Sequence, residues 1–154
     1  MAETKTLRHA SLDDVPKLME MGRTLYTDSS YSLFGLDPAR AQQMLEKFII
    51  EGQEQFLVLI SHDEGRSVGA LAAYAFSPLF SSDKVATEVL LWLDPEYRTG
   101  HRGNELLDAY EYWAKLVGCR AAQYGLLSSA DPRLARLYER RGAKETERVY
   151  LKEL

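Results

Sequence analysis

A short loop rich in arginine and glycine, at residues 98–103, is the part of this sequence whose residue types point most directly to chemistry. It reads Arg-Thr-Gly-His-Arg-Gly and lies between an apolar strand pattern at residues 87–93 and an amphipathic helix pattern. The start of a helix leaves backbone N–H groups without acceptors, and the helix dipole adds partial positive charge there. Because Arg98 and Arg102 add full charges, the loop predicts an anion site, and a phosphate oxygen is its natural ligand.

A single carboxylate, that of Glu88, interrupts the apolar strand pattern. Burial raises the pKa of a carboxyl group, and a raised pKa suits a general base that accepts a proton from an ammonium group, directly or through water. Two other interpretations stay open: a carboxylate in solvent at a sheet edge, or one paired with an arginine. An ordered water is a further candidate base. Regular alternation predicts that Glu88 shares one face of the strand with Leu90 and Trp92.

Length and composition predict one domain over residues 1–154. The chain has 154 residues, of which 45% are hydrophobic and 27% charged, as in soluble globular proteins. No apolar run approaches the roughly 20 residues that a membrane helix needs. The polar N-terminus predicts no signal peptide, so we expect a cytoplasmic protein without a membrane partner.

Charge and ligand residues exclude several kinds of site. The formal net charge of −4 disfavours a nucleic-acid partner. Cys119 is the only cysteine, which excludes an internal disulfide and fits a reducing compartment. The three histidines lack metal-ligand spacing, so we predict no metal site.

Periodicity and capping residues predict the elements that position the loop and Glu88. Helix starts are indicated by Ser11, by Asp37 followed by proline, and by Asp131 followed by proline. A further helix begins after the loop, near residue 103. Strand patterns occur at residues 6–10, 56–60, 67–76, 87–93, 120–126 and 144–151.

This order of elements, together with two motifs, resembles the GCN5-related N-acetyltransferase (GNAT) superfamily over nearly the whole chain. The loop at residues 98–103 is similar to the family signature Arg/Gln-x-x-Gly-x-Gly/Ala, although His101 stands in place of the middle glycine. The second motif, LARLYERRGAK at residues 134–144, keeps the family spacing from Tyr138 to Gly142, and Ala143 replaces the usual phenylalanine.

The resemblance implies an α/β (α+β) fold. We expect a central mixed, mostly antiparallel sheet of six to seven strands, flanked by about four helices, with a V-shaped splay between strands 4 and 5. It also implies an acetyl-CoA-dependent N-acetyltransferase that acts on a primary amine of a small molecule or protein. A catalytically degenerate module that binds acyl-CoA and regulates a partner is the alternative.

Cofactor-binding residues follow from the resemblance. In the family, backbone N–H groups of the fourth strand bind the thioester, and the glycine loop wraps the pyrophosphate of coenzyme A. The residues so implied are Leu91, Trp92, Leu93, Arg98, Thr99, Gly100, His101, Arg102, Gly103, Asn104 and Asp131.

The resemblance also implies roles outside the cofactor loop. Tyr138 is implied as the acid that protonates the leaving thiolate, although a tyrosine of the helix core is the other interpretation. His101 has three interpretations: an exposed loop residue, a phosphate contact or a base. Acceptor contacts are implied for the loops at residues 27–36 and 77–84, and relatives that pair through edge strands imply a homodimer.

Overall fold

The computed structural model describes residues 6–154. Residues 1–5, part of the polar stretch that predicts no signal peptide, lie outside the described residues. No helix within the described range is long and apolar enough to cross a membrane.

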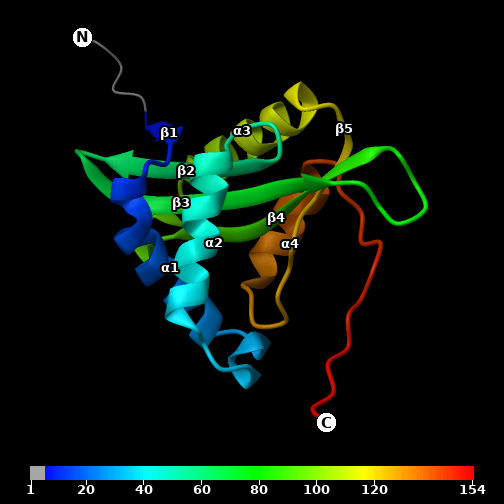
Figure 1. Cartoon of the computed structure of the whole chain (residues 1–154), viewed down its shortest axis with the longest axis horizontal. Helices are drawn as coiled ribbons and strands as arrows, with labels where there is room; N and C mark the ends of the chain where they lie inside the picture. The colour runs from blue at the N-terminus through cyan, green and yellow to red at the C-terminus, as the bar shows by residue number, and fades with distance from the viewer. Residues whose placement is uncertain (1–5) are drawn as a thin grey trace.

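One five-stranded sheet forms the centre of the fold (Figure 1). Its strands lie in chain order: β1 (Leu7–His9), β2 (Phe56–Asp63), β3 (Arg66–Phe76), β4 (Lys84–Leu93) and β5 (Cys119–Gln123). The first three pairings are antiparallel and the last, between β4 and β5, is parallel. The mixed, mostly antiparallel sheet is therefore confirmed.

Four α-helices cover the two faces of the sheet (Figure 1). Helices α1 (Val15–Thr27) and α2 (Pro38–Glu51) pack on one face, and α3 (Arg102–Leu116) and α4 (Pro132–Arg140) on the other. Short 3-10 turns η1, η2 and η3 span Leu12–Asp14, Ser30–Leu33 and Pro95–Tyr97.

The helix starts predicted at Asp37 and Asp131 are confirmed in detail, whereas Ser11 caps the short turn η1 and α1 begins only at Val15. The Asp37 carboxylate accepts the Arg40 N–H at 3.0 Å, and that of Asp131 accepts the Arg133 N–H at 2.9 Å. Each cap gives an acceptor to a backbone donor that the helix itself cannot satisfy.

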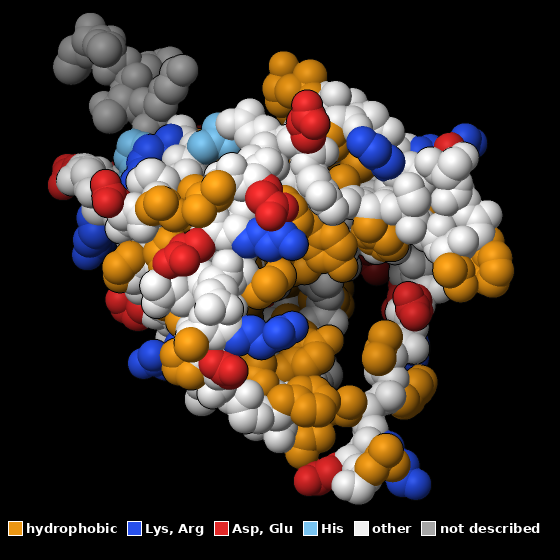
Figure 2. Space-filling view, viewed as in Figure 1, with side chains coloured by type: hydrophobic (Ala, Val, Ile, Leu, Met, Phe, Trp, Pro, Cys, Tyr) orange, Lys and Arg blue, Asp and Glu red, His pale blue; other side chains and the backbone are white. Residues whose placement is uncertain are grey.

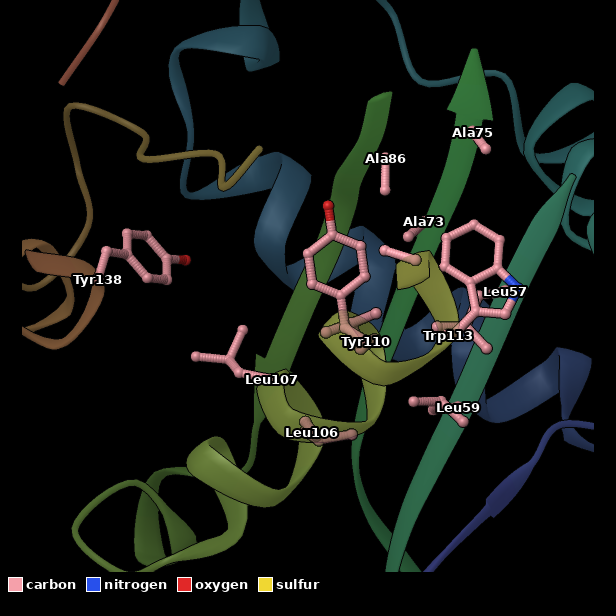
Figure 3. Close-up of a cluster of buried hydrophobic side chains, with 12 residues drawn as sticks. Leu57, Leu59, Ala73, Ala75, Ala86, Leu106, Leu107, Tyr110, Trp113 and Tyr138 are labelled. Atoms are coloured by element: carbon pink, nitrogen blue, oxygen red, sulfur yellow. The ribbon is translucent and has the colours of Figure 1, made fainter. Parts of the chain in front are cut away.

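The core is largest beneath α3 and α4, where alternate residues of β2, β3 and β4 meet two aromatic residues of α3 (Figure 3). Tyr110 and Trp113 lie between the helix and the sheet, and Tyr138 approaches from α4. A second cluster joins α1 to the opposite face through Leu18, Met21 and Ile60. Both faces of the central strands are thus buried, which fits their nearly continuous apolar sequence.

The predicted strand at residues 144–151 is wrong, and the described chain has five strands rather than six to seven. After α4, Gly142 takes a left-handed backbone with φ of +91°, and the Ala143 N–H donates to the Tyr138 carbonyl at 3.0 Å. The following residues are extended and meet no neighbouring strand within the described chain. Alternating side chains are not enough for a strand, because a strand also needs a hydrogen-bonded neighbour.

Strands β4 and β5 separate soon after they pair. Their register runs only from Lys84 opposite Cys119 to Thr87 opposite Gln123. From Glu88 onward, the β5 side of β4 has no strand partner within residues 6–154. The expected splay between the fourth and fifth strands is therefore present.

Candidate active site at the β4–β5 splay

A β-bulge in β4 decides which way Glu88 points. Leu90 lies opposite Ala72, whereas Glu88 lies opposite Ala73, so Val89 is an extra residue in β4. Ala72 belongs to the cluster beneath α1, and Ala73 to the cluster beneath α3 and α4. Because residues directly opposite in a sheet share a face, Glu88 faces α3 and α4. The prediction that it shares a face with Leu90 is wrong, since the bulge shifts the alternation by one residue.

The Glu88 carboxylate is desolvated and has one backbone partner. Its Oε2 atom accepts the Gly125 N–H at 3.1 Å across the splay. Burial raises the pKa of Glu88 from 4.5 to about 7, and the hydrogen bond from Gly125 acts in the opposite direction. No basic side chain pairs with it among the described residues. Of the interpretations left open by the sequence, the geometry favours a proton acceptor.

Two buried tyrosines, Tyr110 from α3 and Tyr138 from α4 (Figure 3), bind backbone carbonyls at and just after the end of β5. The Tyr138 hydroxyl donates to the Gly125 carbonyl at 3.2 Å, and the Tyr110 hydroxyl donates to the Gln123 carbonyl at 2.8 Å. Burial is the main cause that raises the pKa of each phenol, and the nearby charge of Glu88 adds to it. Both hydroxyls therefore keep their protons at neutral pH.

Tyr138 is held by its ring as well as by its hydroxyl. The ring stacks on Tyr124 with centroids 4.8 Å apart. The 3.2 Å bond to Gly125 is long for an O–H···O contact, so the hydroxyl can exchange that partner at small cost.

The loop at residues 98–103 follows β4 after the short turn η3 and is tied to the end of the strand. The Arg98 Nε atom donates to the Leu93 carbonyl at 2.8 Å, and its guanidinium lies 4.7 Å from the centre of the Trp92 ring. Thr99 and Gly100 are exposed beside it. The exposed Arg98 charge therefore lies where the splay meets the loop.

His101 occupies the position of the missing glycine without strain. Its backbone has φ of −89° and ψ of −10°, which any residue can adopt, and it forms the N-cap of α3. The side chain is exposed, and its Nε2 atom lies 3.4 Å from Glu105 Oε1. Of the three interpretations of His101, the structure fits an exposed loop residue.

Arg102 is directed away from the loop and holds the β2–β3 hairpin. Its guanidinium pairs with Asp63 Oδ1 at 2.8 Å and donates to the His62 carbonyl at 2.9 Å. It also lies over the Tyr97 ring at 5.1 Å, and the residue is buried. The Tyr97 hydroxyl donates to the other Asp63 oxygen at 2.9 Å. The charge of this side chain is therefore satisfied inside the protein, and only its backbone N–H stays a candidate for anion binding.

The first turn of α3 provides the remaining donors. The Glu105 N–H donates to the His101 carbonyl at 3.0 Å, whereas the N–H groups of Arg102, Gly103 and Asn104 precede the first helical acceptor. At Gly103, an added Cβ atom would lie 3.6 Å from a Leu93 methyl carbon. This glycine thus packs the start of α3 against the end of β4, with its N–H in the unsatisfied turn.

Asn104 and Asp131 already have partners within the protein. The Asn104 Oδ1 atom accepts a hydrogen bond from Arg141 at 3.1 Å. Asp131 caps α4, and Arg133 is the main cause that lowers the pKa of its carboxyl group to about 2. Their side chains therefore serve as helix contacts in this structure.

Leu91, Trp92 and Leu93 form the last part of β4. They pair with β3 on one side only, since β5 has already separated. Leu91 and Leu93 pack towards α3, and the Trp92 indole donates to Asp94 Oδ1 at 3.1 Å on the other face. The open edge of this backbone lines the splay next to the loop.

An apolar groove lies on the opposite face of the sheet, between α2 and the β4 bulge. Its volume is about 170 Å³. Its lining is entirely apolar and consists of Met44, Leu45, Phe48, Ala72, Val89 and Leu90. Because of the bulge, Glu88 faces α3 and α4, whereas Val89 lines the groove on the opposite face of the sheet.

The structure brings Glu88 and Tyr138 together at Gly125, and it brings the start of α3 to Leu93 at the end of β4. It separates from them the charged group of Arg102 and the cap residue Asp131. Sequence reasoning missed Gly125 and Tyr110. A glycine inside the strand predicted at residues 120–126 was the one available signal for Gly125, because a glycine in a strand favours a close backbone approach.

Comparison with known proteins gives a consistent result. A family model described as the acetyltransferase (GNAT) family matches residues 19–143. The amino-acid acetyltransferase of Vibrio cholerae serotype O1 is 28% identical over 120 residues, which are 78% of this chain and 23% of that protein. The chain thus spans about a quarter of the length of the curated relatives that it matches.

Solved structures share the fold. A transcriptional regulator from Bacillus halodurans C-125 superposes with a TM-score of 0.76 at 18% identity, covering 97% of this chain and 99% of that one. Glucosamine-6-phosphate N-acetyltransferase from Arabidopsis thaliana superposes with a TM-score of 0.74 at 15% identity, covering 98% and 99%. The family model covers most of the sequence and the sheet has the expected splay, so the chain belongs to the acetyltransferase (GNAT) family.

Proposed function

We propose that this protein transfers an acetyl group from acetyl-CoA to the primary amine of a small molecule or a protein. The observation that carries the proposal is the desolvated Glu88 carboxylate at an open splay. Further along the same strand, Leu93 packs against the start of α3 with its unsatisfied N–H groups. Acetyl-CoA supplies the acetyl group as a thioester. The unsatisfied donors at residues 102–104, the Arg98 charge and the open β4 edge fit its anionic and carbonyl groups.

The proposed chemistry gives one task to each group. Glu88 accepts a proton from the ammonium form of the acceptor, so that its nitrogen becomes a nucleophile. N–H groups at residues 91–93 donate to the carbonyl oxygen on which negative charge develops. The nitrogen bonds to the carbonyl carbon as the C–S bond breaks, and it loses its second proton to solvent. The Tyr138 hydroxyl turns from the Gly125 carbonyl, donates its proton to the leaving sulfur and regains one from solvent, so that the products are the amide and the free thiol.

The acceptor is proposed from the groove. Because the groove is lined by apolar side chains and includes Val89, the residue that follows Glu88, it suits an amine that carries an apolar group. The Vibrio relative is named an amino-acid acetyltransferase, so amino acids are the first class to test. We also propose a homodimer, supported by the exposed apolar residues Val149, Tyr150, Leu151 and Leu154.

A screen that measures released thiol tests both activity and acceptor. Amino acids with apolar and acidic side chains, polyamines, aminoglycosides and peptides with free N-termini would be compared. We expect the highest kcat/KM for amines with an apolar group. If calorimetry shows acetyl-CoA binding but no amine is acetylated, the protein is instead a binding module, and if acetyl-CoA does not bind, both functions are wrong.

Replacing Tyr138 with phenylalanine should lower kcat by about tenfold or more, because it removes the donor to the leaving sulfur. Affinity for acetyl-CoA, measured by calorimetry, should change little. Tyr110→Phe is the matched control, since it removes another buried hydroxyl bonded to a backbone carbonyl near the β5 end. Equal kcat values for wild type and Tyr138→Phe would assign Tyr138 to the core alone.

Replacing Gly103 with valine should weaken acetyl-CoA binding by about tenfold or more. A branched side chain in the first turn of α3 crowds Leu93 and hinders the approach of an anion to the backbone. Gly103→Ala is the control, because a single methyl group fits at 3.6 Å from Leu93. Unchanged affinity in the valine variant would place the anion elsewhere.

A further inference from the structure

Arg141 fastens the end of α4 to α3. It is the C-cap of α4, three residues after Tyr138, and its backbone N–H donates to the Tyr138 carbonyl at 3.1 Å. Its guanidinium crosses to α3, where it pairs with Asp108 and Glu111 at 2.6 and 2.8 Å and donates to Asn104 at 3.1 Å. The Arg141 side chain is only 14% exposed. A nearly buried cation with three partners is held in one orientation.

Glu111 shares one carboxylate oxygen between Arg141 and Tyr124. The Arg141 Nε atom donates to Glu111 Oε1 at 2.9 Å, and the Tyr124 hydroxyl donates to the same oxygen. Burial is the main cause that raises the pKa of Tyr124 to about 12, and the hydrogen bond to Glu111 adds to it, so the phenol keeps its proton and remains the donor. Because Arg141 fixes the carboxylate, the Tyr124 hydroxyl has one defined position.

Tyr124 supports Tyr138 in two ways. The two rings stack with centroids 4.8 Å apart. Tyr124 also precedes Gly125, whose carbonyl accepts the Tyr138 hydroxyl at 3.2 Å. The segment that makes both contacts has already left the sheet, since the pairing of β4 with β5 ends at Gln123. The hydrogen bond to Glu111 therefore holds Tyr124 where strand pairing no longer does.

We propose that Glu111, held by Arg141, is a positioning residue that keeps the Tyr138 hydroxyl where it can donate to the leaving sulfur. This role rests on the proposed function, in which Tyr138 is the acid. Glu111 acts through Tyr124 and takes no part in the transfer itself. Without Glu111 the Tyr124 ring is free to shift, and Tyr138, which stacks on it, loses the orientation that proton transfer to the sulfur requires.

Glu111 lies on the other side of the sheet from the proposed acceptor groove. The groove is lined by residues of α2 and β4, on the face that Figure 2 shows, where hydrophobic side chains gather beside α2. Helices α3 and α4, which carry Glu111 and Tyr138, pack on the opposite face. A change at Glu111 should therefore appear in kcat and leave KM for the amine unaltered.

Glu111→Ala is expected to lower kcat by about three- to tenfold, with an acetyl-CoA affinity close to that of the wild type. Asp108→Ala is the matched control, because it removes another carboxylate that pairs with Arg141, from a side chain that is 70% exposed. Its kcat should stay within about twofold of the wild type. Glu111→Gln keeps an oxygen for the Tyr124 hydroxyl and should restore kcat. Steady-state kinetics measures these values at a temperature where melting curves show every variant to be folded.

The double variant Glu111→Ala/Tyr138→Phe tests whether Glu111 acts through Tyr138. If it does, kcat should equal that of Tyr138→Phe alone, because no hydroxyl is left to position. A further loss as large as the loss that Glu111→Ala causes in the wild type would overturn the proposal. Equal kcat values for Glu111→Ala and Asp108→Ala would also overturn it.

NMR spectra of protein with isotopically labelled tyrosine rings give a readout that does not depend on activity. The Tyr138 signal is the one that is missing from Tyr138→Phe. Glu111→Ala should shift or broaden this signal, whereas Asp108→Ala should leave it unchanged. A wild type that acetylates no amine would refute the proposed function, and the catalytic role of this contact with it. An unchanged Tyr138 signal in Glu111→Ala would refute the positioning role alone.

Discussion

Glu88→Gln is expected to lower kcat by on the order of 100-fold or more, which is the usual contribution of a general base. Glutamine keeps an oxygen that can accept the Gly125 N–H, so the geometry of the splay should survive. It cannot accept a proton from the acceptor amine. Acetyl-CoA affinity should therefore stay close to that of the wild type, and the loss should appear in kcat. The measurement is steady-state kinetics with the best amine from the screen, beside calorimetry.

The pH dependence adds a second readout. Burial raises the pKa of Glu88 to about 7, so the carboxylate forms as the pH rises through that value. Wild-type kcat/KM should rise over the same range, whereas the residual activity of Glu88→Gln should lack this step. Glu54→Gln, a change at an exposed residue, is the control and should keep the wild-type kcat/KM and its rise near pH 7. A step at pH 7 that persists in Glu88→Gln would assign the base to another group.

Stability gives a readout of Glu88 that does not depend on activity. The folded-state pKa lies above 4.5, so between pH 4.5 and 7 the folded chain binds more protons than the unfolded chain. The free energy of unfolding therefore falls as the pH rises through this window. Above pH 7 the buried charge costs on the order of 1–3 kcal/mol. Glu88→Gln should be more stable than the wild type by that amount at pH 8, and similar to it at pH 4.

Local sequence signals predicted the frame of this site. The Asp37 and Asp131 caps fixed two helix starts, and the loop at residues 98–103 fixed the start of α3. These signals work because capping and turns depend on neighbouring residues alone.

The bulge and the partners of side chains could not be predicted in the same way. No glycine or proline in β4 marks a bulge at Val89, and the extra residue can be recognised only from the register with β3. Arg102 looked like a phosphate ligand because its partner, Asp63, is 39 residues away in the sequence. Residues 144–151 do alternate between apolar and charged side chains, but no strand of the described chain lies beside them. In each case the missing information was a contact between distant segments.

The role of Arg102 can be tested through stability. Arg102→Met is expected to lower the free energy of unfolding by about 2–3 kcal/mol, because it leaves Asp63 without its cation and the His62 carbonyl without a donor. This loss of stability is smaller than the loss expected for a fully buried ion pair, since the Asp63 side chain is 40% exposed. Urea unfolding at neutral pH measures the change, and an unaltered m-value would show that the unfolded state is the same.

The comparison with Arg98→Met distinguishes an internal anchor from a phosphate ligand. Arg98 is exposed and is held by one backbone carbonyl and the face of the Trp92 ring, so its loss should cost about 1 kcal/mol of stability. It should weaken acetyl-CoA binding in a salt-dependent way, because an exposed charge near an anion is screened. For Arg102→Met, a loss of affinity without a loss of stability would mean that its guanidinium leaves Asp63 to bind the anion. If Arg102 is an internal anchor, Arg102→Met should instead reduce stability. Its affinity for acetyl-CoA should then recover at lower temperature, where the variant is fully folded.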